Sequence, residues 1–218
     1  AALETRFITV FERCTGEPKI GSRSVSRLLF NRTLGWYCIN FSYSGLFMEA
    51  LPDTTVVREV IEGANGILCA ARRPPYIIDT TTGDPDDIVV LAERLAQCQV
   101  SLLDATISGA SSQLENREAV LMVGGEPAAY DACADLLRLL ADEVFYVGPS
   151  GCGSKAKLAT NLVLGLNRLV LAEGIVFAEK LGLPLDNFLR LLKVGPAYSV
   201  AVDVKGQKML HNDFEPVS

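Results

Sequence analysis

The 218-residue sequence contains one histidine, no CxxC pair of cysteines and no excess of positive charge. With His211 as the only histidine, Ser/His/Asp and Cys/His catalysis and histidine-based metal sites lack their central residue. The six cysteines are scattered, which argues against disulfides and a zinc site and indicates a reducing, cytoplasmic setting. We therefore expect lysine, tyrosine, aspartate or glutamate to carry out any proton transfer in this chain.

The sequence also lacks a basic stripe and an uncharged apolar run. Its net charge of −6 argues against nucleic acid as a partner and favours a small metabolite. The longest apolar run, residues 158–178, contains Asn161, Asn167, Arg168 and Glu173, whereas a membrane span needs ~20 nearly uncharged residues. We therefore expect a buried helix there and no membrane partner. No secretory signal is visible at the N-terminus.

Hydrophobic patterning predicts two domains, residues 1–150 and 151–218. In the first, short β-rich runs alternate with helical ones, which is typical of an α/β layer. The strands are predicted at 76–79, 100–103, 119–123 and 144–147, and the helices at 84–97 and 127–141. After residue 150 the spacing is helical, with helices predicted at 154–180, 185–193 and 198–210. The first 45 residues show no sustained period and receive no assignment.

The stretch GCGSKAKLATN at 151–161 places a glycine-rich turn at a helix start, and three interpretations compete for it. A P-loop requires Gly-Lys-Ser/Thr, but Gly153 is followed by Ser154 and a displaced lysine. A dinucleotide fingerprint is satisfied by Gly151, Gly153 and Ala156, but it requires a strand soon afterwards, and the helical pattern continues to Gly182.

The third interpretation is a catalytic helix. Lys157 and Asn161 are four residues apart and share one helix face, and apolar residues cover most of the remaining surface. A thin polar stripe of this kind is typical of an active-site wall. An ordinary helix with a solvated edge produces the same periodicity.

Four motifs in fixed order extend this third interpretation. They are LPD at 51–53, IDTTTGDP at 78–85, DATISGA at 104–110 and GCGSKAKLATN at 151–161. Together they resemble the β-hydroxyacid dehydrogenase family, which includes 3-hydroxyisobutyrate dehydrogenase and relatives of 6-phosphogluconate dehydrogenase. The resemblance implies an α/β fold: an incomplete Rossmann-like NAD(P)-binding domain, a long inter-domain helix and part of an all-α domain. That helical domain commonly builds a dimer, so a homodimer is expected.

The resemblance also implies roles for individual residues. Lys157 matches the catalytic lysine and Asn161 the substrate-binding asparagine, while Ser108 and Gly109 match the turn that holds the substrate carboxylate. A hydroxyl and turn amides can donate hydrogen bonds to a carboxylate, and an ammonium group can exchange a proton with the carbonyl oxygen. Without the resemblance, Ser108 and Gly109 would form an ordinary turn at a strand end.

Three further residues match the cofactor side of the family's site: Leu51, Pro52 and Thr82. The cofactor implied is NAD or NADP, and no metal is implied. Thr82 lies in a DTTTGDP segment that would also make an ordinary helix cap.

The sequence departs from the family in three places. No GxGxxG motif occurs before residue 50, position 110 is alanine where many relatives have a second glycine, and the family's later Lys-Asp segment is absent. The chain is therefore expected to be a fragment. We predict an NAD(P)-dependent oxidoreductase acting on the CH–OH group of a small 3-hydroxy acid. The alternative is a catalytically dead remnant that serves only as an oligomerisation module.

Overall fold

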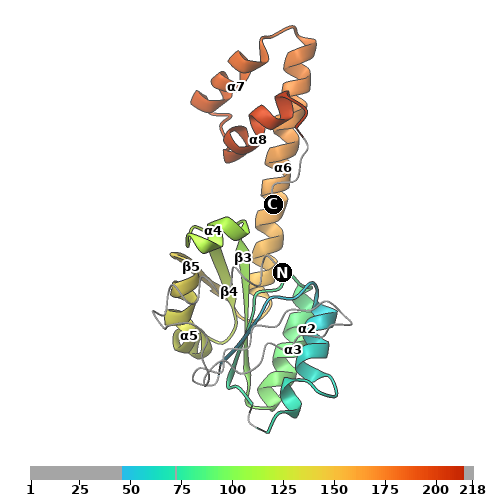
Figure 1. The fold of residues 1–218 in the computed structure, drawn as a ribbon, viewed down its shortest axis with the longest axis vertical. Helices are drawn as coiled ribbons and strands as arrows, with labels where there is room; N and C mark the ends of the chain where they lie inside the picture. The colour runs from blue at the N-terminus through green and yellow to red at the C-terminus, as the bar shows by residue number, and fades with distance from the viewer. Residues whose placement is uncertain (1–45, 72, 214–218) are drawn as a thin grey trace, which may run out of the picture. The chain divides into compact units, whose positions relative to one another are not determined.

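The computed structural model describes residues 46–71 and 73–213, so the unassigned first 45 residues lie outside the described part. Backbone contacts divide the chain into two compact units, residues 1–157 and 158–218. The first unit contains a five-stranded sheet (Figure 1). Its strands are β1 (Leu46–Glu49), β2 (Tyr76–Asp79), β3 (Ser101–Ser108), β4 (Val120–Gly124) and β5 (Glu143–Gly148). Strands β1 to β3 are parallel, β4 is antiparallel to β3, and β5 is parallel to β4.

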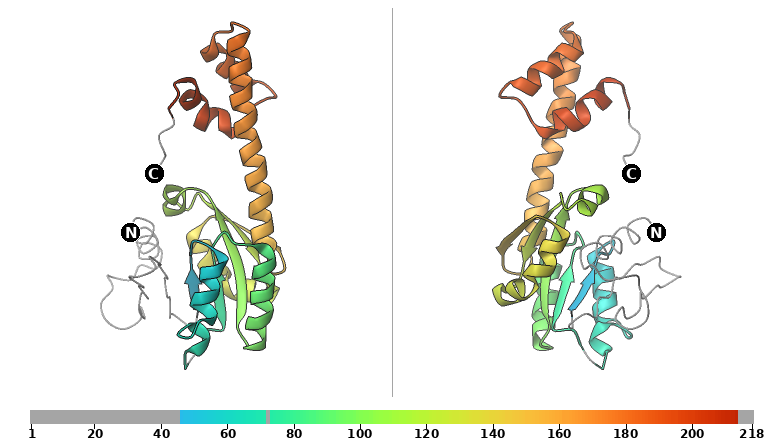
Figure 2. Two further views of the ribbon diagram at one scale, coloured as in Figure 1. Left: turned by 90° about the vertical axis from the view of Figure 1, so that its right-hand side faces the viewer. Right: turned by 60° about the vertical axis from the view of Figure 1, so that its left-hand side comes forward.

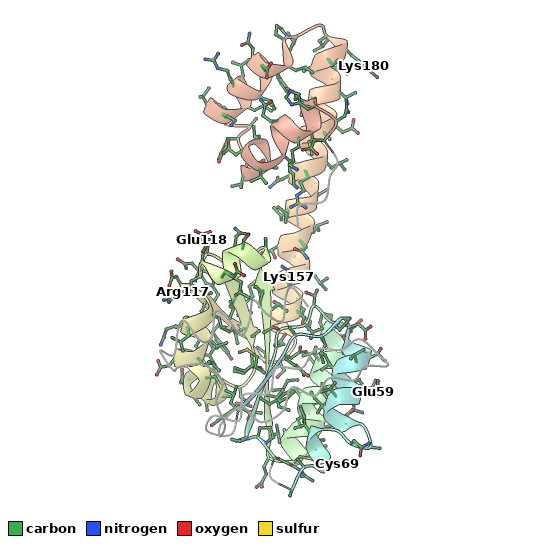
Figure 3. All side chains as sticks on the ribbon, viewed as in Figure 1. Glu59, Cys69, Arg117, Glu118, Lys157 and Lys180 are labelled. Carbon is green, nitrogen blue, oxygen red and sulfur yellow. The ribbon has the colours of Figure 1, made fainter. Side chains whose placement is uncertain are left out.

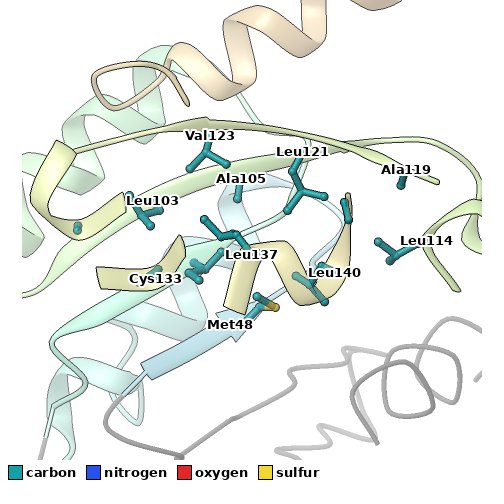
Figure 4. Close-up of a cluster of buried hydrophobic side chains, with 13 residues drawn as sticks. Met48, Leu103, Ala105, Leu114, Ala119, Leu121, Val123, Cys133, Leu137 and Leu140 are labelled. Atoms are coloured by element: carbon teal, nitrogen blue, oxygen red, sulfur yellow. The ribbon is translucent and has the colours of Figure 1, made fainter. Parts of the chain in front are cut away.

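Helices cover both faces of this sheet, which confirms the predicted α/β class. One face carries α2 (Thr54–Glu62) and α3 (Pro85–Gln97), with the short 3-10 helix η1 (Ile67–Cys69) following α2. The other carries α4 (Ser111–Glu115) and α5 (Pro127–Leu140). Alternate strand residues divide between two cores because successive side chains point to opposite faces. Figure 4 shows the core beneath α4 and α5.

Local sequence signals set the start of α3. The Asp84 side chain accepts hydrogen bonds from the backbone N–H groups of Asp86 and Asp87, and Pro85 occupies the first turn. A side-chain acceptor before the helix satisfies N–H groups that have no partner within it. The sequence prediction of a start at Asp84-Pro85 is confirmed.

One predicted strand ends too early. The strand predicted at 100–103 extends to Ser108 in β3. The sequence pattern stops at Asp104 because Asp104 and Thr106 are polar, yet both are fully buried. Their side chains form hydrogen bonds with residues 151–154, where a later helix begins, so these polar groups are tolerated inside the strand.

The second unit is helical. It contains most of α6 (Cys152–Lys180), together with α7 (Leu185–Val194) and α8 (Val200–Leu210), as Figure 2 shows. Leu171 and Ile175 of α6 pack with Leu189 of α7 and Val202 of α8 in a small core. Helices α7 and α8 therefore cover only the second half of α6.

The prediction that residues 158–178 form a buried helix is wrong for the first half of that segment. Leu162 is 64% exposed and Val170 is 68% exposed, whereas Leu171, Ile175 and Ala178 are buried. The physical reason is that the small core formed with α7 and α8 takes its α6 residues from Leu171 onwards. By length and composition alone, α6 is long and apolar enough to cross a membrane, a test that core helices of soluble proteins also pass.

Candidate functional site

Strand β3 holds the start of α6 through two buried side chains. The Asp104 carboxylate accepts hydrogen bonds from the backbone N–H groups of Gly151 at 3.3 Å and Ser154 at 2.9 Å. The Thr106 hydroxyl donates to the carbonyl oxygen of Gly153 at 2.9 Å. A negative charge is favourable at a helix N-terminus, where N–H groups lack partners within the helix. The first turn of α6 is thereby fixed on β3.

This arrangement decides between the interpretations of the glycine turn. A phosphate at the start of α6 would need the N–H groups that Asp104 already occupies, and the carboxylate would repel it. The P-loop and the dinucleotide fingerprint at Gly151–Ala156 are therefore both wrong for this helix. The glycines serve close packing instead: a Cβ on Gly153 would overlap the carbonyl oxygen of Asp104 and lie 2.7 Å from that of Met122.

Lys157 lies in the second turn of α6, beside the end of β3 (Figure 3). Its Nζ donates a hydrogen bond to the carbonyl oxygen of Ile107 at 2.6 Å. The side chain is partly buried, and this burial lowers the pKa of the ammonium group below its usual value. Ser108 and Gly109 follow Ile107 directly, so the structure brings three of the sequence-predicted site residues together.

The turn after β3 requires glycine at position 109, where φ is +151°. A side chain there would be strained by this backbone conformation and would crowd Ala119. At the next residue, the N–H group of Ala110 donates to the Oε1 atom of Gln113 at 2.8 Å. Ser108 is half-buried, whereas Gly109 and Ala110 are exposed. The turn thus presents its backbone to solvent next to the Lys157 ammonium group.

The loops that follow β1 and β2 are joined by hydrogen bonds. The N–H group of Leu51 donates to the Thr81 hydroxyl at 3.0 Å, and the Thr80 hydroxyl donates to the carbonyl oxygen of Glu49 at 2.8 Å. Pro52 and Thr82, which the sequence assigns to the cofactor side, are exposed in these two loops. The loops lie at the carboxyl ends of parallel strands, where open α/β sheets bind their ligands.

Asn161 is the one predicted site residue that belongs to the second unit. It lies four residues after Lys157 on α6 and is exposed. The structure places it on the same helix as the lysine, and its role at the site stays a prediction.

Sequence reasoning missed a row of buried carboxyl groups. Glu49, Asp79 and Asp104 occupy matching register positions on β1, β2 and β3, and each is at most 1% exposed. No described residue forms a hydrogen bond to either carboxylate oxygen of Glu49. Burial raises the pKa of Glu49 well above its ordinary value, and the Asp79 carboxylate raises it further. Burial likewise raises the pKa of Asp79 to about 6. The row has no local signal, because the pairing register of three strands brings these residues together.

Replacing Glu49 by glutamine is expected to stabilise the first unit at pH 8 and to have little effect at pH 4. A buried carboxyl with a raised pKa holds its proton more tightly in the folded state, so the free energy of unfolding falls as pH rises above its ordinary pKa of 4.5. Glutamine removes that loss, for an expected gain of about 1–3 kcal/mol at pH 8.

Urea unfolding at the two pH values measures this change. Glu59→Gln is the matched control, because Glu59 is exposed on α2. Equal effects of the two substitutions at pH 8 would contradict the assignment of an unfavourable buried charge to Glu49.

Comparison with known proteins gives two matching families, one for each part of the chain. Residues 41–148 match the NAD binding domain of 6-phosphogluconate dehydrogenase. Residues 151–218 match the family described as NAD-binding of NADP-dependent 3-hydroxyisobutyrate dehydrogenase.

Individual relatives agree with these matches. The uncharacterized oxidoreductase YkwC of Bacillus subtilis is 33% identical over 160 residues, covering 73% of this chain and 56% of the relative. The 2-(hydroxymethyl)glutarate dehydrogenase of Eubacterium barkeri is 27% identical, covering 78% of this chain and 57% of the relative. The solved structure of Mycobacterium tuberculosis 3-hydroxyisobutyrate dehydrogenase with L-serine is 26% identical, with a TM-score of 0.71 over 80% of this chain and 62% of its own.

The mixed sheet with helices on both faces, followed by one long helix, defines the class of NAD-binding dehydrogenase folds. Within that class, the chain belongs to the β-hydroxyacid dehydrogenase family. The chain spans 56–57% of the length of the two curated relatives described above.

Proposed function

We propose that this chain is part of an NAD(P)-dependent oxidoreductase that acts on the CH–OH group of a small 3-hydroxy acid. The observation that carries the proposal is the Lys157 ammonium group, held 2.6 Å from the carbonyl oxygen of Ile107 at the end of β3. This contact places a proton-transfer group next to a turn whose backbone is exposed. Membership of the family supports the reaction type.

The proposed mechanism uses these residues in order. The Ser108 hydroxyl and the Gly109 N–H group donate hydrogen bonds to the substrate carboxylate. Lys157, as general base, accepts the proton of the substrate hydroxyl while a hydride leaves the carbon that bears this hydroxyl. Asn161 helps to orient the substrate. The lowered pKa of Lys157 favours this step because more of the lysine is neutral at a given pH.

The positions of two loops support a site for the nicotinamide end of a dinucleotide. The loops at Leu51–Pro52 and Thr80–Thr82 lie at the carboxyl ends of neighbouring parallel strands, and β3 with its turn is the next strand of the sheet. NAD or NADP would accept the hydride when bound. Leu51, Pro52 and Thr82 are the residues we propose to line that end of the site, whereas the Gly151 and Ser154 amides at the start of α6 are already bonded to Asp104.

A fluorescence titration of the purified chain with NADH and with NADPH tests the proposal. We expect binding at micromolar concentrations of at least one of them, because hydrogen bonds join the two loops that are proposed to contact the nicotinamide end. Circular dichroism confirms beforehand that the protein is folded. A folded chain that binds neither nucleotide would contradict the proposed function.

A second candidate is supported by the exposed apolar residues of α6. A helix whose Leu162, Val163 and Val170 are all more than half exposed is suited to contact with another chain. In that case the chain serves as an oligomerisation module without catalysis. Sedimentation analysis tests this second candidate. A folded chain that binds neither NADH nor NADPH but sediments as a stable dimer would support it.

A further inference from the structure

The side chain of Gln113 accepts a hydrogen bond from a backbone N–H group in the turn that follows β3. Its Oε1 atom accepts from the N–H group of Ala110 at 2.8 Å, and the same oxygen would lie 3.4 Å from a Cβ atom on Gly109. The Gln113 amide oxygen therefore lies over the turn formed by Gly109 and Ala110. Both turn residues and Gln113 are exposed, so a ligand can reach the same place.

We propose that Gln113 is a specificity-determining residue that weakens the binding of carboxylates at this turn. The inference rests on the proposed function, in which the turn holds the substrate carboxylate. A carboxylate has two oxygens, each able to accept two hydrogen bonds, so it gains from every donor nearby. In the proposed function the Ser108 hydroxyl and the Gly109 N–H group donate to this carboxylate, but the Ala110 N–H group next to them is already paired with Gln113.

A ligand must then either forgo one hydrogen bond or displace the Gln113 oxygen. Both alternatives reduce the affinity of an anion more than that of a neutral group, because hydrogen bonds to charged acceptors are the stronger ones. A ligand that presents a hydroxyl group needs fewer donors and loses less. The turn thus discriminates by charge, although no acidic side chain lies in it.

The same hydrogen bond has a second role, because Gln113 is the third residue of α4. A side chain at this position that bonds to the N–H group before the helix stabilises the helix start. The two roles predict opposite results. If Gln113 only stabilises α4, carboxylate affinity follows the stability of the helix. If Gln113 competes with the carboxylate, affinity rises when the side chain is removed.

Two substitutions separate these roles in a titration followed by NMR of the Gly109 and Ala110 backbone amides. The probe is 3-hydroxypropionate, and 1,3-propanediol is the neutral comparison. Gln113→Ala should tighten 3-hydroxypropionate binding by about threefold to tenfold, because one N–H group becomes available. Gln113→Glu should keep or strengthen the helix start yet weaken 3-hydroxypropionate binding by at least about threefold, since a charged acceptor competes better and repels the anion.

Binding of 1,3-propanediol should change less than twofold in both variants, and Ser112→Ala, an exposed neighbour, should behave as the unchanged chain. Unchanged or weaker 3-hydroxypropionate binding by Gln113→Ala overturns the inference and leaves the proposed function standing. If neither the unchanged chain nor any variant shows shifts of the two amides, the carboxylate turn of the proposed function fails, and the inference fails with it.

Discussion

Lys157→Met is expected to lower kcat for oxidation of a 3-hydroxy acid by roughly 10²–10⁴-fold while the fold and nucleotide affinity are retained. Methionine keeps the apolar part of the side chain in its partly buried place and removes the group that exchanges a proton. Steady-state measurement of NADH or NADPH formation gives the effect. In the unchanged chain, kcat/KM for oxidation should rise with pH, because the neutral lysine is the base.

Lys155→Met is the matched control, because Lys155 is exposed on the same helix two residues earlier. Its substitution should leave turnover within about twofold, since it removes an equal charge outside the proposed site. Equal losses in the two variants would show that the effect comes from charge or from helix stability and not from proton transfer. Normal turnover in Lys157→Met would exclude the lysine as the base.

Gly153→Ala is expected to destabilise the first unit by about 3 kcal/mol or more. An added methyl group would overlap the carbonyl oxygen of Asp104 and crowd that of Met122, and these backbone atoms cannot turn away as a flexible side chain can. The start of α6 must then move from β3, which breaks the hydrogen bonds to Asp104 and Thr106. Urea unfolding followed by circular dichroism measures the loss.

Gly165→Ala is the control within α6, because this substitution should keep or raise the free energy of unfolding. Apart from the adjoining helix backbone, no described atom lies within 4 Å of a Cβ added there, and alanine is favoured over glycine in a helix by about 1 kcal/mol. This variant should therefore be as stable as the unchanged chain or more so. A similar destabilisation by both substitutions would show that helix flexibility, and not contact with β3, explains the glycine at 153.

The sequence predicts the parts of the fold that depend on local signals. Helices α3 and α5 begin where Asp84-Pro85 and Glu126-Pro127 indicate. Strand β1 and helix α2 were missed for physical reasons. Alternation in the four-residue strand β1 is disturbed by the buried Glu49. Helix α2 begins with threonines and valines, which have low helix propensity, and it is stabilised by the burial of Val57 and Ile61 against the sheet.

The candidate site likewise has some features that local sequence signals predict and others that depend on the fold. Its residue types and their order could be read from four motifs, but the contact between Lys157 and Ile107 joins residues 50 positions apart and has no local signal. The role of Asp104 at the start of α6 is likewise a consequence of the fold. The resemblance assigns Thr82 to the cofactor side, and this role stays a prediction. The hydrogen bonds by which Thr80 and Thr81 join the two loops link residues about 30 positions apart and have no local signal.

The order of the five strands in the sheet equals their order along the chain. Each described strand therefore pairs with the strand that precedes or follows it, and each pairing closes a loop of modest length, which keeps the entropic cost of every step small. Folding rates fall as the sequence separation between contacts grows, so this order keeps a mostly parallel sheet, which is slow to form by its nature, faster to fold than one whose neighbours are distant in sequence. During synthesis on the ribosome, every newly emerged strand would find its partner already present, so the sheet can grow strand by strand in the direction of translation.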